Sequence, residues 1–246
     1  MVCLEKPFLS IIIPVHNEER RLPNTIEQAL HFMSQQTYLA ELILVENGSQ
    51  DRTLEIARAF AEKHPQLRVI QEQARGKGLA VQHGMLEACG EYRFMADADF
   101  SMPPGEINRF LPPILADSQI AIASREAPGA VRYDEPAYRH LIGRIFNLLI
   151  RMLALPDLQD TQCGFKCLRA DVAEDLFPCL TLTGLAFDVE LLFIARQRGY
   201  RIVELPIPWY FNADSKVRVV NDSFEMARDL LRIRLNSLQG RYRECS

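Results

Sequence analysis

The sequence predicts one α/β domain with a mostly parallel central sheet and helices on both of its faces. In the first half of the chain, short apolar segments alternate with longer segments whose apolar residues recur at helical spacing. This order is typical of parallel sheets covered on both faces. The content of 48% hydrophobic and 24% charged residues is that of a globular protein. No linker or repeat divides residues 1–246, so a single domain is expected.

Four strands and three helices follow from the local sequence of the first half. Residues 9–14 are apolar and β-branched, as buried strands are. Residues 17–35 carry apolar side chains at helical spacing, beginning with Leu22. A turn at residues 46–51 closes the second strand, and Gly48 suits a positive φ there. Strands are expected at residues 9–14, 41–45, 67–71 and 92–96, and helices at residues 17–35, 52–63 and 78–88.

The second half is less regular and is predicted to continue the same architecture. Residues 124–135 form a polar segment with Pro128 and Gly129, which we interpret as a mobile lid. Strands are expected at residues 120–123, 164–168 and 200–206, and helices at residues 106–115, 137–155, 189–198 and about 223–241.

Composition argues against two classes of protein. The net charge of −4 is unlike that of a general nucleic-acid-binding protein, which would be basic. No stretch reaches the roughly 18 uncharged apolar residues of a membrane span. The nearest stretch, residues 141–155, is interrupted by Arg144 and Arg151. Because the first strand begins almost at once and the six cysteines show no C-x-x-C pair, we expect a cytoplasmic protein with reduced thiols.

Two carboxylates, Asp97 and Asp99, directly follow the strand predicted at residues 92–96. In open α/β sheets, ligands bind outside the carboxyl ends of the strands, so these acids should lie at the binding edge together with the loop after Pro14. Spaced two residues apart, they can approach one Mg²⁺ or Mn²⁺ ion, which prefers oxygen ligands. A solvated acidic turn is the alternative for such a short motif.

Two further turns carry groups that suit a nucleotide. Glu46 ends the second strand, where it could bind a base or ribose. Lys77 lies between two glycines before the third helix, where a cation and a helix N-terminus favour anions. The spacing is not that of a P-loop, and no G-x-G-x-x-G follows the first strand.

Several segments, in this order, resemble the GT-A glycosyltransferases of family 2. In the first half they are Ser10 to Glu18, Val45 to Asp51, Gly76 to Gly78 and Asp97 to Asp99. In the second half, Asp160 to Lys166, Ala186 to Leu192 and Asp229 to Arg234 resemble the dolichyl-phosphate β-glucosyltransferase branch, with the mannose synthases as close cousins. The resemblance covers roughly residues 8–240. It implies a GT-A fold and transfer of a hexose, with inversion, from a nucleotide diphosphate to a polyprenyl phosphate.

The resemblance also implies roles for individual residues. Pro14, His16, Glu18 and Glu46 match positions that hold the base and ribose, and Asp97 and Asp99 match the metal and diphosphate motif. Arg125 and Arg139 match arginines that contact phosphates, and Lys77 and Lys216 are further candidates for phosphate binding.

We interpret Asp99, Asp160 and Asp188 as catalytic-site residues. Asp160, Asp188 and Glu190 could position metal or acceptor, because an acceptor phosphate is already an anion and needs no strong general base. The alternatives are a turn cap for Asp160 and helix N-terminal acids for Asp188 and Glu190.

Two helices could contact a membrane without spanning it. On the helix predicted at residues 137–155, Arg144, Asn147 and Arg151 form one polar stripe among apolar residues. The amphipathic C-terminal helix lies in a stretch, residues 216–246, with seven Lys or Arg and four acids. Ordinary packed helices with solvated arginines are the alternative. We expect peripheral membrane contact, since the expected acceptor is a lipid.

The leading hypothesis is therefore a metal-dependent transferase of glucose from UDP-glucose to a polyprenyl or dolichyl phosphate. A family 2 enzyme that uses GDP-mannose, or a sugar hydroxyl as acceptor in polysaccharide assembly, is the second hypothesis. A nucleotide-sugar binding protein without catalysis is the third.

Overall fold

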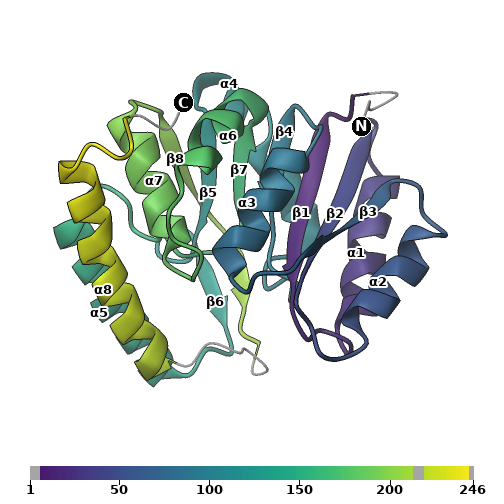
Figure 1. Cartoon of the computed structure of the whole chain (residues 1–246), viewed down its shortest axis with the longest axis horizontal. Coiled ribbons are helices and arrows are strands. Elements are labelled where there is room, and N and C mark those ends of the chain that lie inside the picture. The colour runs from purple at the N-terminus through teal and green to yellow at the C-terminus, as the bar shows by residue number, and fades with distance from the viewer. Residues whose placement is uncertain (1–5, 213–218, 244–246) are drawn as a thin grey trace.

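A mixed seven-stranded sheet forms the centre of the molecule (Figure 1). The computed structural model describes residues 6–212 and 219–243, with the backbone alone for residues 219–224. The strand order is β3-β2-β1-β4-β7-β5-β8, and β6 and β9 form a separate small sheet. Neighbouring strands of the large sheet are parallel, except that β7 is antiparallel to both β4 and β5. The predicted α/β class with a mostly parallel sheet is confirmed.

The predicted elements lie close to their expected positions, whereas β6, β9, α6 and η2 were not predicted. The strands are β1 (Leu9–Val15), β2 (Ala40–Asn47), β3 (Leu67–Glu72), β4 (Tyr92–Met95), β5 (Ile120–Ser124), β6 (Val131–Tyr133), β7 (Lys166–Arg169), β8 (Ile202–Pro206) and β9 (Pro208–Tyr210). The helices are α1 (Leu22–Ser34), α2 (Thr53–Ala61), α3 (Lys77–Glu87), α4 (Ile114–Asp117), α5 (Ala137–Leu153), α6 (Ala170–Leu176), α7 (Phe187–Gln197) and α8 (Val219–Leu238), with 3-10 helices η1 (Pro104–Phe110) and η2 (Phe177–Cys179).

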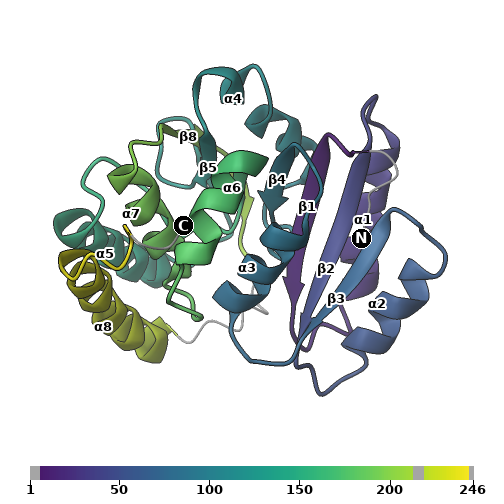
Figure 2. The ribbon, with the colours of Figure 1, turned by 45° about the horizontal axis from the view of Figure 1, so that its top comes forward.

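The sheet separates two hydrophobic cores. On one face, Ile12 and Ile43 pack with residues of α3, α6, α7 and α8. On the other face, Ile11 and Ile13 pack with residues of α1, α2 and η1. Figure 2 shows α3 and α6 on the same face of the sheet. Because β1 is covered on both faces, its sequence is an apolar run, interrupted only by Ser10, rather than an alternating one.

Two predicted segments differ in the structure. The helix expected at residues 106–115 is divided into η1 and α4, because Pro112 and Pro113 lie between them and proline interrupts helical hydrogen bonding. The segment interpreted as a lid, residues 124–135, contains β6, which pairs with β9 through a register that joins Val131 to Pro208. Part of that segment is therefore tied to a strand far along the chain.

The reversed strand β7 brings the second half of the chain to the edge where β1, β2 and β4 end. Met95, at the end of β4, pairs with Lys166, at the start of β7, and Lys166 also pairs with Ile122 of β5. The residues before β7 and after β5 therefore lie beside those that follow β4. This places Asp97, Gly164 and Arg125 at one edge of the sheet.

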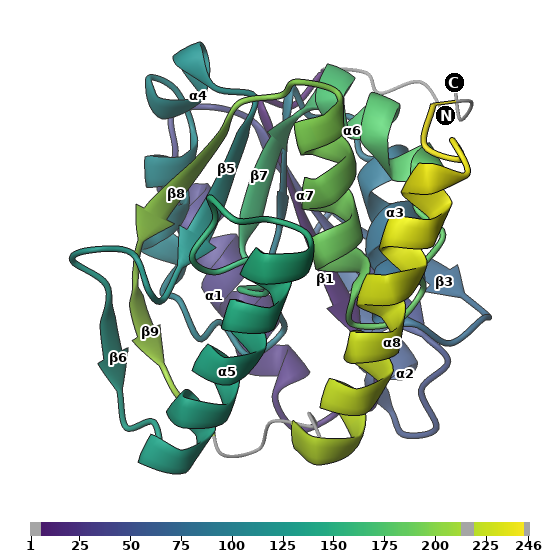
Figure 3. The same cartoon turned by 90° about the vertical axis from the view of Figure 1, so that its left-hand side faces the viewer.

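Helices α5 and α8 stand side by side beyond β8, as Figure 3 shows. Each carries large apolar side chains that face solvent. Their exposed fractions are 62% for Ile145, 68% for Met152 and 85% for Leu238. Among the described residues, no helix is long and apolar enough to cross a membrane.

The cysteines differ from the expectation of reduced thiols. Cys89 and Cys179 each take part in a disulfide, whereas Cys163 and Cys167 are free and buried. Sequence spacing could not reveal this, because disulfide formation depends on which sulfurs the fold brings together.

Candidate active site

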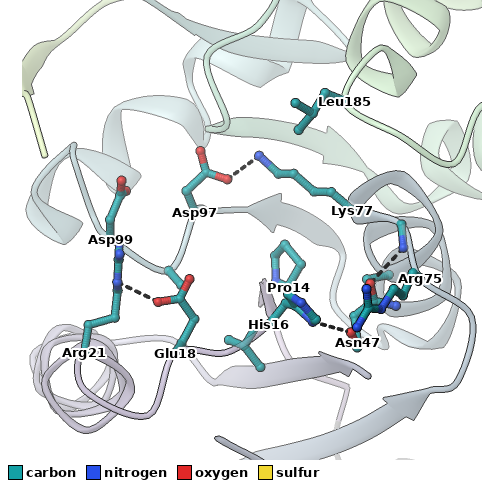
Figure 4. A pocket seen from close by; sticks show the side chains of 14 residues that line it. Pro14, His16, Glu18, Arg21, Asn47, Arg75, Lys77, Asp97, Asp99 and Leu185 are labelled. Atoms are coloured by element: carbon teal, nitrogen blue, oxygen red, sulfur yellow. Dashed lines mark hydrogen bonds and ion pairs between the residues drawn. The ribbon is translucent and has the colours of Figure 1, made fainter. Parts of the chain in front are cut away.

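A pocket of about 430 Å³ opens at the carboxyl ends of β1, β2 and β4 (Figure 4). Loops after these three strands supply much of its wall, and the loop from β3 into α3, the start of α3 and Leu185 before α7 supply the rest. Its lining residues are Pro14, Val15, His16, Glu18, Arg21, Asn47, Arg75, Gly76, Lys77, Ala80, Asp97, Ala98, Asp99 and Leu185. The predicted binding edge of the sheet is therefore hollowed.

Hydrogen bonds hold His16 in one orientation and one tautomer. Its Nδ1 lies 2.7 Å from the carbonyl oxygen of Asn47, so this nitrogen donates. Its Nε2 lies 3.1 Å from the side-chain amide nitrogen of Asn17, so this nitrogen accepts. The Asn17 amide is oriented in turn by the Gln50 N–H, which donates to Asn17 Oδ1 at 2.7 Å. Both ring nitrogens are thus engaged within the protein, and the ring forms a fixed wall of the pocket.

The turn after β2 is fixed by its own side chains. Glu46 is 1% exposed, and its carboxylate accepts a hydrogen bond from the Ser49 N–H at 2.5 Å. Asn47 Nδ2 donates to the Ala74 carbonyl, and Asn47 Oδ1 accepts from the Gly76 N–H. Asn47 lines the pocket and Glu46 does not.

Gly76 and Gly78 hold Lys77 against the loop before α7. Gly76 has φ +151°, and a Cβ there would lie 2.4 Å from the Thr183 carbonyl oxygen. A Cβ on Gly78 would lie 2.7 Å from Phe187 Cβ, and the Gly78 N–H donates to the Thr183 carbonyl at 2.9 Å. Glycine is required at both positions because the two backbones approach so closely.

Lys77 and Asp97 form an ion pair, with 2.5 Å between Nζ and Oδ1, as Figure 4 shows. Burial disfavours charge on both groups. Asp97 nevertheless keeps the pKa of Lys77 above its ordinary value, and Lys77 keeps the pKa of Asp97 below its own. On its other side, Asp97 packs against Gly164, where a Cβ would lie 2.0 Å from Asp97 Oδ2.

The negative charge of Asp99 is stabilised less than that of Asp97, which has the Lys77 ammonium beside it. Asp99 Oδ1 accepts a hydrogen bond from the Ser101 N–H at 3.1 Å. Burial, followed by repulsion from Asp97, raises the pKa of Asp99.

The donor set around these two acids fits a hard divalent cation that brings other ligands with it. No group of three His, Cys, Asp or Glu residues that could enclose a metal occurs in the described part of the chain. Mg²⁺ is commonly held by one or two carboxylates and completes its shell with phosphate oxygens and water. Two carboxylates beside an open pocket are suited to that arrangement.

A second pocket, of about 280 Å³, meets the first at Lys77, Asp97, Asp99 and Leu185. Its other walls come from the loop after β5, the strand β9 and the helices α5, α7 and α8. These walls include Arg125, Arg132, Arg139, Phe146, Asn147, Gly164, Asp188, Trp209, Phe211 and Met226. The two acids therefore stand where one pocket opens into the other.

Arg125 is bound to Asp160 through three hydrogen bonds. Its Nε and Nη2 donate to the two carboxylate oxygens at 2.7 and 2.9 Å, and its backbone N–H donates at 3.0 Å. Asp160 is fully buried, and although burial favours its neutral form, Arg125 lowers its pKa to about 2. The guanidinium also lies over Trp209, 5.4 Å from the ring centroid.

Arg139 differs from its arginine neighbours because no acidic partner contacts it among the described residues. Its guanidinium lies over Phe211, 5.2 Å from the ring centroid. Arg132, in contrast, pairs with both Glu126 and Glu135. Arg139 is thus the arginine of this pocket whose charge is available to an anion.

Asp188 is bound to a buried lysine. Lys166 is 0% exposed, and its Nζ donates to Asp188 Oδ1 at 2.6 Å and to the Cys163 carbonyl at 2.5 Å. Burial raises the pKa of Asp188 even though Lys166 and Lys77 both oppose the shift. Glu190 lines neither pocket; its carboxylate accepts hydrogen bonds from Thr181 and from Tyr242.

The structure brings most predicted site residues together. The first pocket is lined by Pro14, His16, Glu18, Lys77, Asp97 and Asp99, and the second by Lys77, Asp97, Asp99, Arg125, Arg139 and Asp188. Glu46 and Asp160 lie behind the walls, and Lys216 lies outside the described residues.

Sequence reasoning missed several lining residues. Arg21 pairs with Glu18 at 2.6 Å. Its spacing of three residues from that acid could have predicted the pair. Arg75 adjoins the predicted Gly-Lys-Gly turn. Trp209 and Phe211 carried no signal, because only the pairing of β6 with β9 brings them to the pocket.

Comparison with known proteins agrees with this architecture. Residues 10–177 match the family described as Glycosyl transferase family 2. Dolichyl-phosphate beta-glucosyltransferase of Drosophila melanogaster is 34% identical, covering 97% of this chain and 78% of that protein. The protein of the same name from Saccharomyces cerevisiae is 32% identical, covering 98% and 78%.

Among solved structures, the chain is similar to glucosyl-3-phosphoglycerate synthase from Mycobacterium tuberculosis, crystallised with Mn²⁺, uridine diphosphate and phosphoglyceric acid. The TM-score is 0.67 at 20% identity, covering 96% of this chain and 78% of that one. The same enzyme has been crystallised with Mg²⁺ and uridine diphosphate. At this identity the similarity shows the fold, and it confirms the expected GT-A architecture.

Proposed function

Because this chain belongs to glycosyl transferase family 2, we propose that it transfers glucose from UDP-glucose to a polyprenyl phosphate such as dolichyl phosphate, with inversion at the anomeric carbon. The names of its relatives support glucose as the transferred sugar and dolichyl phosphate as the acceptor, and the UDP bound in the similar solved structure supports the nucleotide. The observation that carries the proposal is the meeting of two pockets at Asp97 and Asp99, one suited to a nucleotide and the other holding an available guanidinium.

The donor occupies the larger pocket. His16 and Asn47 use their polar atoms within the protein, so they present a rigid wall to the base and ribose. Pro14 and Glu18 complete that wall. Glu46 acts indirectly, by holding the turn that carries Asn47. A pre-formed wall lowers the entropy lost on binding.

The diphosphate lies where the pockets meet. Lys77 and the N-terminus of α3 both favour an anion there. Asp97 and Asp99 would hold Mg²⁺ or Mn²⁺, which would neutralise the charge that grows on the departing diphosphate.

The acceptor phosphate lies in the second pocket against Arg139. A guanidinium without an acidic partner can bind a phosphate through two parallel hydrogen bonds. Arg125 is already committed to Asp160, so it positions the loop after β5 and adds positive charge at the pocket wall. The aromatic rings of Trp209 and Phe211 hold the two guanidinium groups in place.

No side chain has to remove a proton from this acceptor, because a phosphate monoester is already ionised near neutral pH. Asp188 therefore does not need to act as a base. Its carboxylate accepts a hydrogen bond from Lys166, which suits a residue that maintains the shape of the site. A sugar hydroxyl as acceptor would instead need a carboxylate free to take a proton.

The exposed apolar face formed by α5 and α8 lies next to the acceptor pocket, to which both helices contribute residues. We infer that this face rests on a membrane that supplies the lipid. Exposed arginines, among them Arg144, Arg151 and Arg232, suit an anionic lipid surface. The cytoplasmic location expected from the sequence remains a prediction.

The decisive experiment incubates the protein with radiolabelled UDP-glucose, dolichyl phosphate and Mn²⁺, followed by extraction of lipid. A labelled glucosyl lipid is expected with the native chain and not with Asp99→Asn. Label in a water-soluble glycoside instead would indicate a sugar hydroxyl acceptor. Formation of product from GDP-mannose alone would overturn the proposed donor.

A further inference from the structure

The ion pair between Lys77 and Asp97 occupies one of the two carboxylates suited to the cation. The Lys77 Nζ lies 2.5 Å from Asp97 Oδ1, and no other carboxylate contacts this amine in the described part of the chain. Asp99, two residues away, accepts a hydrogen bond from the Ser101 N–H, and Arg21 is the cation that acts on its charge. A metal ion that used both acids would therefore have to displace the ammonium group of Lys77.

The backbone around Lys77 leaves the side chain as the part that can move. Gly76 and Gly78 are pressed against Thr183 and Phe187 at distances that admit no Cβ. The Gly78 N–H is hydrogen-bonded to the Thr183 carbonyl. The Lys77 side chain, in contrast, is 29% exposed and borders both pockets. It can turn from Asp97 toward an anion in either pocket without a backbone shift.

The charges favour an exchange of partners. Asp97, Asp99 and Lys77 together carry one net negative charge. A free divalent ion that took Asp97 would deprive Lys77 of the carboxylate that it contacts and place a second cation beside its ammonium group, with only the more distant Asp188 and Asp99 among the described residues to oppose the repulsion, which is costly. The diphosphate of a nucleotide carries at least two negative charges, so a divalent ion that arrives with it provides Lys77 with a new anionic partner as the old one is lost.

We propose that the ion pair with Lys77 blocks Asp97. Asp97 and Asp99 therefore bind a divalent cation together with a nucleotide diphosphate and bind the free cation poorly. This inference rests on the proposed function for the identity of the diphosphate, although its test does not require turnover. Lys77 is thus a specificity-determining residue that selects the metal–nucleotide complex over the bare ion.

Direct titration of the protein with Mn²⁺, followed by the electron paramagnetic resonance signal of the free ion, tests this exchange. Lys77→Met removes the ammonium and is expected to bind Mn²⁺ alone about tenfold more tightly than the native chain, within the usual range of coupling between sites. UDP should tighten Mn²⁺ binding strongly in the native chain and much less in Lys77→Met. Lys77→Gln provides a second, more polar variant with the same expectation, and circular dichroism checks that each variant is folded.

Two controls separate the exchange from a general change in charge. Lys63→Met removes one positive charge from the exposed turn just after α2 and should leave Mn²⁺ binding unchanged. Asp97→Asn added to Lys77→Met should abolish the gain. The proposal is overturned if Lys77→Met gains nothing, if Lys63→Met gains as much, or if the gain survives Asp97→Asn. Failure to form a glucosyl lipid would refute the proposed function and leave this titration readable.

Discussion

Two close contacts fix the position of the Asp97 carboxylate. Its carboxylate lies between the Lys77 amine and the backbone of Gly164, whose missing side chain makes the room. Asp97 and Gly164 are far apart in the sequence and meet because β7 runs antiparallel to β4. The glycine at position 164 is thus part of the site, although it carries no functional group.

Gly164→Ala should reduce activity far more than stability. A Cβ at this position would lie 2.0 Å from Asp97 Oδ2, so the carboxylate must leave its place beside Lys77. A misplacement of about 1 Å can cost on the order of 100-fold in rate, and we expect kcat/KM for glucosyl lipid formation to fall by about that factor. The matched control is Gly184→Ala, where a Cβ would meet nothing within 4 Å. Equal kcat/KM in the two variants would contradict the packing argument.

The pair formed by Asp160 and Arg125 should contribute stability that depends on pH. Asp160→Asn leaves Arg125 without its counter-charge, and breaking such a buried pair costs about 3–5 kcal/mol. Because the pKa of Asp160 is lowered from 3.8 to about 2, its contribution is complete above about pH 4 and is lost as pH falls toward 2.

Urea unfolding of the native chain and Asp160→Asn across this pH range measures the effect. The difference in the free energy of unfolding between them should narrow as pH falls. Asp157→Asn is the control, since Asp157 pairs with Arg196 at the exposed surface, where such pairs are worth about 0–1 kcal/mol. A difference that stays constant from pH 5 to pH 2 would contradict the assignment.

At the scale of helices and strands, the sequence predicted what depends on local pattern. Apolar runs located the strands from β1 to β4, and helical spacing located α1, α2, α3 and α5. The division of residues 106–115 was missed because two adjacent prolines outweighed the helical pattern. The pairing of β6 with β9 was missed because both strands are three residues long and their contact is not local.

The same limit applies to the site. Asp97 and Lys77 were predicted because their neighbours in the sequence, a buried strand and two glycines, are informative. The sequence does not show that Arg125 is paired with Asp160, or that Arg139 has no acidic partner among the described residues. Both facts depend on side-chain packing across the edge of the sheet. The place of Trp209 beside Arg125 was likewise not predicted, because it also depends on packing between distant segments.

Helix α5 should carry much of the binding to a membrane. Ile145 and Met152, 62% and 68% exposed, lie seven residues apart on one face of the helix. Because burial of such a side chain is worth about 1.5–3 kcal/mol, Ile145→Glu combined with Met152→Glu should weaken binding to vesicles with anionic lipids by at least about tenfold. Sedimentation with vesicles measures this loss.

The matched control introduces the same charges elsewhere. Leu39→Glu combined with Ile114→Glu replaces two exposed apolar residues, Leu39 before β2 and Ile114 on α4. This variant should sediment with vesicles as the native chain does. Equal loss in both double variants would indicate an effect of net charge, and no loss in the α5 variant would remove the proposed membrane face.

At the scale of the whole molecule, the two halves of the chain share one site. The first pocket is built mainly from residues 14–99 and the second mainly from residues 101–226. Two close contacts join the halves: Asp97 against Gly164, and Gly76 and Gly78 against the loop at Thr183. A ligand of the first half should therefore also stabilise segments of the second.

Hydrogen exchange of the native chain, with and without UDP and Mn²⁺, tests this coupling. Ligand binding should slow exchange at residues 14–18 and 76–78, which border the donor pocket, and also at residues 163–166 and 182–187, which touch Asp97 and the glycines. The strand β8 serves as an internal control, because it lies at the far edge of the sheet. Gly164→Ala should keep the protection at residues 14–18 and lose it at residues 163–166, since the added Cβ separates Asp97 from that segment. Protection confined to the first half in the native chain would show that the halves bind independently, and the proposed transfer would then need a different arrangement of the two pockets.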